Sequence, residues 1–502
     1  MKCNRVLIAN RGEIAIRIMR TLQELGMESV AIYSEADALS QHRSFADFAI
    51  ALEGRTSAET YLDVDKVIQA AKVSKADAIH PGYGFLSENA EFAKRVKEAG
   101  LIFIGPSAEA MQQMGDKICA KHLMISKGLA VVPGSDGGVD DEAQLKQVID
   151  TIGLPVIIKA AAGGGGRGMR IVRAKEDASE AYHSCRREAL SSFANDQVFV
   201  EKYIEKPRHI EVQILCDGKN GIHLFERDCS IQRRHQKLLE EAPSLYLNDT
   251  QREHLGQLAV KAALEVGYEG AGTVEFICES PDKAYFMEMN TRIQVEHPVT
   301  EMITGIDIVA EQINIAMGKG LSVTQDEVSI NGWSIEARIN AEDVRQDFMP
   351  APGRVGTIHW PLGFGVRVDT HIYPGYDIPA EYDSMIAKLI VWGRSRQAAI
   401  GKLRRCLAEL NIADISTSSS FHEAILSHPD FVNGNFSTRF LEENSDLLAD
   451  GNEAEERSET CKNIDTICAG FAAQLRPARP SLNCDNRKVW QSISRREAHR
   501  AH

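Results

Sequence analysis

The sequence predicts a protein of several domains that combines a parallel α/β fold with α+β segments. Strand-length apolar runs alternate with helical patterns over the first hundred residues, a glycine-rich turn joins two strands near residue 165, and mixed strands and helices follow from about residue 204. The 502 residues are also too many for one ordinary domain. Composition and patterning change near residues 115, 204 and 444, which divides the chain into three structured segments and a tail.

The first segment has the alternation of strands and helices that is typical of a parallel sheet. Ile14, Ile18 and Leu22 share one helical face, and Gly26 ends that helix. Repeated βα units predict a sheet covered by helices, with ligand-binding loops at the carboxyl ends of its strands. We expect strands at 5–9, 29–33, 76–80 and 101–104, helices at 13–25, 64–71 and 90–99, and ligand-binding loops at 10–12 and 81–84.

The second and third segments predict a small α+β lid and then a larger mixed domain. Glycine and proline are frequent at 131–138, which indicates a hinge. Beyond residue 444, charge and proline indicate a flexible tail with a short helical segment at 464–475. The expected strands are 155–160, 170–173, 198–203, 210–216, 223–227, 272–278 and 285–289, and the expected helices are 177–189 and 252–265.

Composition indicates a cytoplasmic, soluble protein. The net charge of −14 repels nucleic acid and anionic membranes, so neither is an expected partner. No apolar run approaches the roughly 18 residues of a membrane span, and the apolar stretch at the start is too short for a signal peptide. The ten cysteines form no C-x-x-C motif, which is typical of reduced, buried thiols.

Residues 163–168 read Gly-Gly-Gly-Gly-Arg-Gly and satisfy the pattern G-x-G-x-x-G. A dinucleotide loop leads from a strand into a helix, whereas this loop joins two expected strands. The alternative is a plain mobile turn. Four consecutive glycines cost more backbone entropy than a hairpin needs, which favours a loop whose amides close over phosphates. No Walker A motif occurs, so a nucleotide would not be bound by a P-loop.

Lys117 and Lys159 are candidate cations for those phosphates, although for either one alone a surface lysine with a buried stem is the favoured interpretation. Glu275 and Glu288 lie on two apolar strands, and Asn290 shares a strand face with Glu288. Two carboxylates and an amide oxygen suit Mg²⁺, and buried carboxylates need a metal or an ion pair. The alternative is a pair of salt-bridged glutamates.

Two polar stretches complete the candidate site. Residues 290–301 place Arg292, Gln294, Glu296 and His297 directly after the metal strand, where they could bind a small oxyanion and remove its proton. Residues 233–237 supply four basic side chains in five positions. In so acidic a chain this cluster predicts a local anion pocket, and the alternative is a solvated basic turn.

Together these residues resemble the biotin carboxylase family of the ATP-grasp superfamily. The resemblance covers residues 1–443 and rests on many long motifs in one order: 8–15 (IANRGEIA), 80–89 (HPGYGFLSEN), 114–117 (MGDK), the glycine loop, 201–203, 207–211 (PRHIE), 227–242, 288–304, 338–343 (RINAED) and 382–388 (YDSMIAK). It implies a Rossmann-like pre-ATP-grasp domain at 1–114, an ATP-grasp domain at 115–330 with a lid at about 131–204, a C-terminal biotin carboxylase domain at 331–443, and a tail at 444–502 that matches nothing in the family.

The resemblance also implies a role for each motif residue. Glu275, Glu288 and Asn290 match the metal ligands, Glu296 matches the general base, and Arg338 matches the residue that faces the biotin ureido group. Tyr83 and Gly84 match the biotin pocket. The bicarbonate site corresponds to Lys237, Arg292, Gln294 and Val295, of which Lys237 and Arg292 also join Glu296 and Arg338 in catalysis. ATP would contact Lys117, Lys159, Gly165, Gly166, Glu201, Lys202, Tyr203, Ile204, His209, His235, Glu275 and Glu288.

The implied reaction uses ATP and Mg²⁺ or Mn²⁺ to convert bicarbonate into carboxyphosphate and then carboxylates biotin. No Met-Lys-Met biotin-attachment tripeptide occurs, so biotin is expected on a separate biotin carboxyl carrier protein. The chain also lacks a matching carboxyltransferase segment, so carboxyltransferase subunits are expected partners. The family further implies a homodimer and a stand-alone subunit of an acetyl-CoA carboxylase in fatty-acid synthesis.

Three other interpretations stay open at this point. The same chemistry could serve a pyruvate, propionyl-CoA or other acyl-CoA carboxylase, because the acceptor is chosen by the absent carboxyltransferase. Another ATP-grasp ligase, of the carbamoyl-phosphate or purine-pathway kind, is disfavoured by Arg338 and the 288–304 loop. A non-enzymatic nucleotide-binding subunit is disfavoured because each candidate site residue has the type that catalysis requires.

Overall fold

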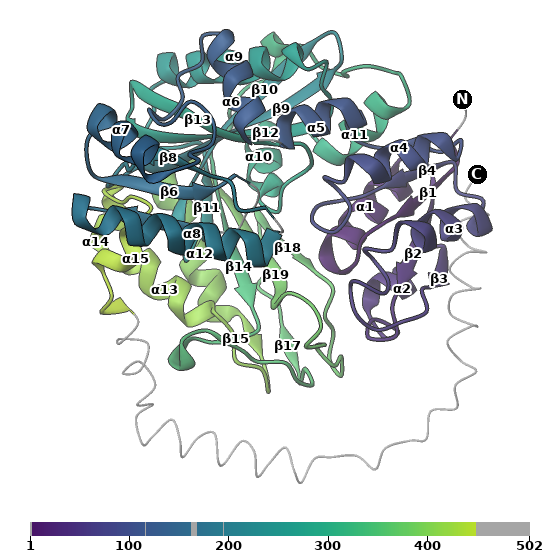
Figure 1. Cartoon of the computed structure of the whole chain (residues 1–502). Coiled ribbons are helices and arrows are strands. Elements are labelled where there is room, and N and C mark those ends of the chain that lie inside the picture. The colour runs from purple at the N-terminus through teal and green to yellow at the C-terminus, as the bar shows by residue number, and fades with distance from the viewer. Residues whose placement is uncertain (1–2, 116, 162–167, 194, 448–502) are drawn as a thin grey trace, which may run out of the picture. The chain divides into compact units, whose positions relative to one another are not determined.

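The computed structural model describes residues 3–115, 117–161, 168–193 and 195–447 (Figure 1). These described residues belong to one compact unit. Gly165, Gly166 and the expected helix at 464–475 lie outside the described residues, and the side chain of Lys117 is not described. Within the described ranges, no helix is long and apolar enough to cross a membrane.

The N-terminal segment forms a five-stranded parallel sheet in the order β3-β2-β1-β4-β5 (Figure 1, purple and blue). The predicted α/β architecture is therefore confirmed. Asp63 and Asn89 begin α3 and α4 by accepting backbone N–H groups of the first turn. The elements are β1 (Arg5–Ile8), α1 (Gly12–Glu24), β2 (Glu28–Tyr33), α2 (Gln41–Phe45), β3 (Phe48–Ala51), α3 (Val64–Ser74), β4 (Ala78–His80), α4 (Ala90–Glu98), β5 (Ile102–Phe103) and α5 (Ala108–Gly115).

A separate three-stranded antiparallel sheet, in the order β7-β6-β8, forms a small α+β layer. Val156 and Ile158 of the central strand pack with Val200 and with Tyr182 of the covering helix in one apolar cluster. The expected strands and helix of this α+β segment are confirmed, and its role as a lid stays a prediction. Its elements are α7 (Glu142–Ile152), β6 (Val156–Ala160), β7 (Met169–Val172), α8 (Ala178–Phe193) and β8 (Val198–Lys202). The helix before it, α6 (Lys117–Ser126), packs with the core of the large sheet instead.

An eight-stranded antiparallel sheet in the order β13-β12-β9-β10-β11-β14-β19-β18 dominates the rest of the unit. The pairing of β11 with β14 makes this sheet continuous across residue 330. A capping box formed by Asn248 and Gln251 begins α9. The strands are β9 (Arg208–Asp217), β10 (Gly221–Arg233), β11 (Gln236–Ala242), β12 (Glu269–Ser280), β13 (Lys283–Asn290), β14 (Trp333–Asn340), β18 (Val366–Thr370) and β19 (Met385–Gly393).

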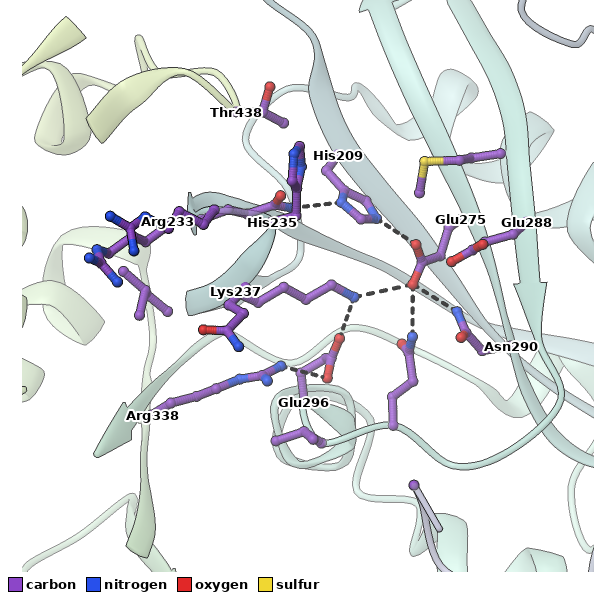
Figure 2. Close-up of a pocket in the computed structure, with 18 of the residues that line it drawn as sticks. His209, Arg233, His235, Lys237, Glu275, Glu288, Asn290, Glu296, Arg338 and Thr438 are labelled. Carbon is purple, nitrogen blue, oxygen red and sulfur yellow. Dashed lines mark hydrogen bonds and ion pairs between the residues drawn. The ribbon is translucent and has the colours of Figure 1, made fainter. Parts of the chain in front are cut away.

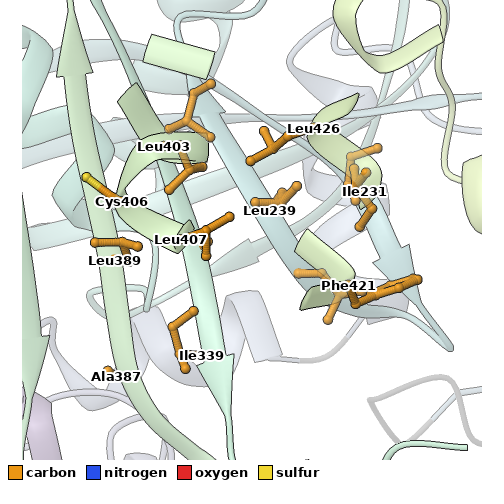
Figure 3. Packing of buried hydrophobic residues seen from close by; sticks show 14 of the residues in the cluster. Ile231, Leu239, Ile339, Ala387, Leu389, Leu403, Cys406, Leu407, Phe421 and Leu426 are labelled. Carbon is orange, nitrogen blue, oxygen red and sulfur yellow. The ribbon is translucent and has the colours of Figure 1, made fainter. Parts of the chain in front are cut away.

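Helices and short strands cover and flank this sheet. They are α9 (Asp249–Glu265), α10 (His297–Thr304), α11 (Ile308–Ala316), α12 (Arg396–Glu409), α13 (Ser419–Ser427), α14 (Pro429–Asn433), α15 (Phe440–Glu443), β15 (Glu342–Asp343), β16 (Met349–Pro350), β17 (Ile358–His359) and β20 (Asn411–Ile412). Side chains alternate between the two faces of β14. Ile335, Ala337 and Ile339 enter an apolar core with α12 and α13 (Figure 3), whereas Glu336 and Arg338 point to the face covered by α10.

Candidate active site

A cavity of about 1270 Å³ opens between the N-terminal loops, the small lid sheet and the large sheet. The predicted site residues within the described ranges line it together, although they come from segments more than 200 positions apart. Lys117 lies in α6, but its side chain is not described. The lining includes Tyr83, Gly84, Lys159, Glu201, Lys202, Tyr203, Ile204, His209, His235, Lys237, Glu275, Glu288, Asn290, Arg292, Gln294, Val295, Glu296 and Arg338.

Lys237 is the centre of the site (Figure 2). Its ammonium donates to Glu211 at 2.6 Å, to Glu296 at 2.6 Å and to Glu275 at 3.2 Å. Burial lowers the pKa of Lys237, but the three carboxylates outweigh burial and raise it well above its usual value. Lys237 therefore stays charged and can offset negative charge brought into the cavity.

Sequence reasoning missed Glu211. This glutamate is fully buried on β9, and besides Lys237 it accepts a hydrogen bond from Arg227 at 2.8 Å. Arg227 is also fully buried and donates to Gln294 at 2.9 Å. The available signal was a charged residue in an apolar strand inside the PRHIE motif. Glu211 thus links the site to a buried hydrogen-bond network.

The predicted metal ligands lie on the adjacent strands β12 and β13. Glu275 is directly opposite Glu288, and Asn290 is opposite Thr273, so the three predicted ligands share one sheet face. Burial raises the pKa of Glu275, but Lys237 and His209 outweigh burial and hold it well below its usual range. Two carboxylates and an amide, with Glu275 ionised, fit the oxygen ligands that Mg²⁺ requires.

Glu275 is crowded by donors. Asn290 donates to it at 2.7 Å, Gln294 donates at 2.9 Å, and His209 Nε2 lies 2.9 Å from its second oxygen. The Gln232 amide contacts Nδ1 of the same histidine at 2.7 Å. Burial lowers the pKa of His209, but Glu275 outweighs burial and raises it. His209 therefore binds the predicted metal carboxylate in this structure.

The basic cluster at 233–237 occupies the turn between β10 and β11 at the edge of the cavity. Arg234 and His235 both adopt left-handed backbone conformations, with φ of 49° and 67°. Asp347 pairs with Arg234 at 2.9 Å and with Arg233. Two of the four basic residues are therefore balanced by a neighbouring carboxylate, whereas Lys237 points to the carboxylates of the cavity floor. Burial lowers the pKa of His235, the fourth basic residue of the turn.

Glu296 and Arg338 face each other across the cavity floor (Figure 2). Arg338 donates to Glu296 at 3.0 Å and to Glu240 on β11 at 2.5 Å. Burial raises the pKa of Glu296, but Lys237, Arg338 and Arg227 outweigh burial and hold it well below its usual range. The carboxylate is therefore ionised and can accept a proton from an acid held between Lys237 and Arg338.

The other predicted anion-site residues converge on the same floor. Arg292 pairs with Glu88 at 2.9 Å, and its guanidinium also donates to Asn290 at 3.2 Å. The carbonyl of Val295 accepts a hydrogen bond from Lys388 at 2.9 Å. Lys388 has no exposed surface, and its hydrogen bond to Val295 holds the loop before α10 in place.

The lid side of the cavity contains a lysine that sequence reasoning missed. Lys159 pairs with the buried Glu201 at 2.7 Å, and Lys121 on α6 pairs with the other oxygen of Glu201. Lys121 stands four positions after Lys117 in the sequence, and this helical spacing is the signal that could have found it. Lys202 donates to the carbonyl of Leu154 at 2.7 Å.

Tyr83 and Gly84 form the N-terminal wall. The Tyr83 hydroxyl donates to Glu13, which pairs with Lys388 at 3.3 Å. Burial and Glu13 raise the pKa of Tyr83 well above its usual value, so the phenol stays protonated. Gly84 has φ of +65°, a left-handed conformation that side-chain-bearing residues rarely adopt.

Comparisons with known proteins identify the family of the chain. Three family models match in sequence: "Biotin carboxylase, N-terminal domain" at 2–111, "Carbamoyl-phosphate synthase L chain, ATP binding domain" at 116–324, and "Biotin carboxylase C-terminal domain" at 336–443. The biotin carboxylase of Nostoc sp. is 52% identical over 88% of this chain and 99% of its own. A pyruvate carboxylase subunit from Methanothermobacter thermautotrophicus is 49% identical over 88% of this chain and 90% of its own.

Solved structures give the same result. Biotin carboxylase of Campylobacter jejuni, in a complex with an ATP ligand, has a TM-score of 0.86 and 48% identity over 88% of this chain and 99% of its own. The biotin carboxylase domain dimer of Hydrogenobacter thermophilus 2-oxoglutarate carboxylase, with MgADP, ADP and bicarbonate, also has a TM-score of 0.86 and 48% identity, over 89% of this chain and 99% of its own. The chain belongs to the biotin carboxylase family and is a ligase with that family's fold.

Proposed function

We propose that this chain uses ATP, Mg²⁺ and bicarbonate to carboxylate biotin carried on a separate biotin carboxyl carrier protein. One observation carries the proposal: Lys237 and Arg338 both donate to Glu296 in a cavity that also holds the Glu275–Glu288 pair. A base is thereby placed between two cations, beside ligands for a metal–nucleotide complex. That combination suits the activation of a small acid anion by a phosphoryl group.

ATP binds between the lid sheet and the large sheet in this proposal. Lys159, Lys121 and His209 would contact the phosphates, and Lys202, Tyr203 and Ile204, at and beyond the end of β8, would hold the adenine; these residues line the cavity. The metal, Mg²⁺ or Mn²⁺, would be held by Glu275, Glu288 and Asn290 and would offset the negative charge of the phosphates when bound. Glu275 must then exchange its contact with Lys237, at 3.2 Å, for the metal.

Bicarbonate occupies the floor formed by Lys237, Arg292, Gln294 and Val295. Lys237 and Arg292 reduce the repulsion between bicarbonate and the γ-phosphate. Glu296 accepts the bicarbonate proton as the oxygen attacks phosphorus, and the product is carboxyphosphate. The lid excludes water from this unstable product, which then breaks down to CO₂ and phosphate.

Biotin enters on the side of Tyr83, Gly84 and Arg338. The released phosphate takes the proton from biotin N1′, which leaves negative charge on the ureido oxygen. The guanidinium of Arg338 stabilises that oxygen by charge-assisted hydrogen bonds. N1′ then attacks CO₂, so one molecule of ATP yields one carboxybiotin, ADP and phosphate.

The proposal also covers the assembly in which the chain acts, that is, its carrier, its carboxyltransferase and the pathway. An acetyl-CoA carboxylase of the fatty-acid pathway is supported by relatives that are named biotin carboxylase along 98–99% of their own length. A second candidate, a pyruvate or 2-oxoglutarate carboxylase, is supported by relatives with those names at 49% and 47% identity. A cytoplasmic homodimer is proposed in both cases, and the dimer is supported by the solved Hydrogenobacter thermophilus domain dimer.

The test is the formation of acid-labile carboxybiotin from radiolabelled bicarbonate. Purified chain with Mg²⁺ and ATP should fix label into free biotin, and omission of ATP or biotin should remove the signal. Label in neither free biotin nor carrier-bound biotin would refute the proposal. Co-purification of the chain with its partners from its own cells then separates the acetyl-CoA and oxo-acid alternatives.

A further inference from the structure

Two glutamates face each other directly beneath Arg338. Glu240 on β11 and Glu336 on β14 are opposite residues in the antiparallel register. Opposite side chains in such a pair have Cβ atoms roughly 5 Å apart. Neither glutamate has any exposed surface, so bulk solvent does not reach their carboxyl groups.

The hydrogen bonds around this pair are incomplete. One oxygen of Glu240 accepts from Arg338 at 2.5 Å. Among the described residues, the other oxygen of Glu240 and both oxygens of Glu336 have no hydrogen-bond partner. Three buried acceptors without a donor are costly, and two facing carboxylates repel. The charged and titratable groups facing the pair are Arg338, Lys388, Lys237, Glu296, Glu13 and Tyr83.

We propose that Glu336 holds a proton and donates it in a hydrogen bond to the free oxygen of Glu240, so that the pair fixes Glu240 against Arg338. This inference rests on the proposed function, because Arg338 is assigned there to the biotin ureido oxygen. A protonated carboxyl is the species that supplies a donor to Glu240 and also removes one of the two facing charges. Glu336 is thus a positioning residue that acts on biotin through Glu240 and Arg338.

The surroundings support a single proton on the pair above pH 7. Burial raises the pKa of Glu336 well above its usual value, with Lys388 opposing and Glu240 reinforcing the shift. Burial raises the pKa of Glu240 to about 7, although Arg338 opposes it. As the pH falls through about 7, Glu240 also becomes protonated, and the charge of Arg338 is then balanced by Glu296 alone. Biotin-dependent turnover should therefore decline on the acid side.

Two substitutions distinguish whether Glu336 acts as a hydrogen-bond donor or as a negative charge. In Glu336→Gln the amide N–H₂ donates to Glu240 as the protonated acid does, whereas Glu336→Leu removes the donor at similar volume. We expect Glu336→Leu to lower kcat/KM for biotin about tenfold or more, in keeping with the loss of a hydrogen bond to a charged group. Its acid limb should move to higher pH, because Glu240 binds its proton more easily. Glu336→Gln should recover most of the lost kcat/KM.

The control is bicarbonate-dependent ATP hydrolysis without biotin, which should be similar in the wild type and both variants because no ureido oxygen is then present for Arg338 to stabilise, and Lys237 still holds the base Glu296. A general folding defect would lower both activities together and contradict a positioning role. Equal losses in Glu336→Gln and Glu336→Leu would also overturn the proposal, since they would mean that Glu336 acts as an ionised partner of Lys388.

Infrared difference spectroscopy tests the proton without any turnover. The wild-type chain at neutral pH should show the C=O stretch of a protonated carboxyl group that is missing from Glu336→Gln. Absence of that band in the wild type would overturn the proposal. This measurement also separates the two claims: a wild type with the band but without biotin-stimulated turnover would contradict the proposed function and leave the shared proton intact.

Discussion

The two faces of the sheet formed by β11, β14 and β19 differ in character. On one face, Leu239, Ile335 and Leu389 pack with α12 and α13 in a continuous apolar core (Figure 3). On the other face, Glu240 and Arg338 approach the cavity beneath α10. Because strand side chains alternate, one backbone supplies both surfaces. The comparison indicates that the apolar face fixes the strands and the polar face uses that rigidity to hold charges in position.

The largest expected effect lies on the polar side, in Glu296→Gln. Gln keeps the shape of the residue but cannot accept the bicarbonate proton as a carboxylate does. We expect bicarbonate-dependent ATP cleavage to fall about 10²–10⁴-fold, the usual contribution of a general base. Steady-state ATP hydrolysis with saturating bicarbonate measures it, and full activity in the variant would remove Glu296 as the base.

Arg338→Ala should have the next largest effect. The substitution removes the cation that faces the ureido oxygen and leaves Glu240 and Glu296 without its donors. We expect biotin carboxylation to fall about 10²–10³-fold, as for the loss of an oxyanion donor. Nucleotide binding, measured by calorimetry, should be retained. Normal carboxylation by this variant would contradict the assigned role.

A substitution on the apolar face should lower the stability of the fold and leave the KM for biotin unchanged. Leu403 on α12 is fully buried in the core under β14 and β19. Leu403→Ala should lower the free energy of unfolding by about 2–5 kcal/mol through lost burial and a residual cavity. Urea denaturation measures this effect, and the KM for biotin of the folded fraction should stay near the wild-type value. A changed KM with unchanged stability would break the division between the faces.

A buried histidine on the apolar face makes the free energy of unfolding depend on pH. His422 on α13 contacts the carbonyl of Arg338 at 2.6 Å, and burial lowers its pKa to about 4. An unfolded histidine titrates near 6.5, so between pH 6.5 and 4 the unfolded chain binds more protons. The stabilisation is complete above pH 6.5 and is lost as the pH falls toward 4, by at most about 3 kcal/mol for this group. Urea denaturation of wild type and His422→Gln at pH 7 and 5 checks it, and equal pH slopes would contradict it.

The smallest expected effect sharpens the metal assignment. Glu288→Gln removes one carboxylate from the pair opposite Glu275. We expect the Mg²⁺ concentration at half-maximal ATP turnover to rise about tenfold or more, because a neutral amide is a weaker ligand for a hard cation. A Mg²⁺ titration at fixed ATP measures it. An unchanged titration would leave Glu288 as a salt-bridging strand residue.

Local pattern predicted the elements best where neighbours in sequence are neighbours in space. The expected helices and strands of the first hundred residues and the strands that contain Glu275 and Glu288 were confirmed within a few residues at each end, whereas α2 and the edge strand β3 were not predicted. The pairings of Lys237 with Glu211 and of Glu240 with Glu336 could not be predicted. They depend on strand order and register across more than 25 and 90 positions, and a period-2 pattern specifies neither.

The motif residues converge in one cavity, but sequence alone did not show what else would contact them. Lys159 and Glu275 were predicted to meet ligands, and the structure pairs each with protein groups first. Such pairings arise because buried charges need partners within the folded chain. Arg233 shows the same limit, since its partner Asp347 lies in a turn more than 100 positions later.

The most direct test of the central claim is ATP hydrolysis by the purified chain with Mg²⁺, compared with bicarbonate alone, biotin alone, and both together. We predict that turnover requires bicarbonate and rises sharply when biotin is added, because CO₂ released from carboxyphosphate is then consumed beside Arg338. Turnover that does not change with biotin would contradict biotin carboxylation and would leave Arg338 without its assigned substrate.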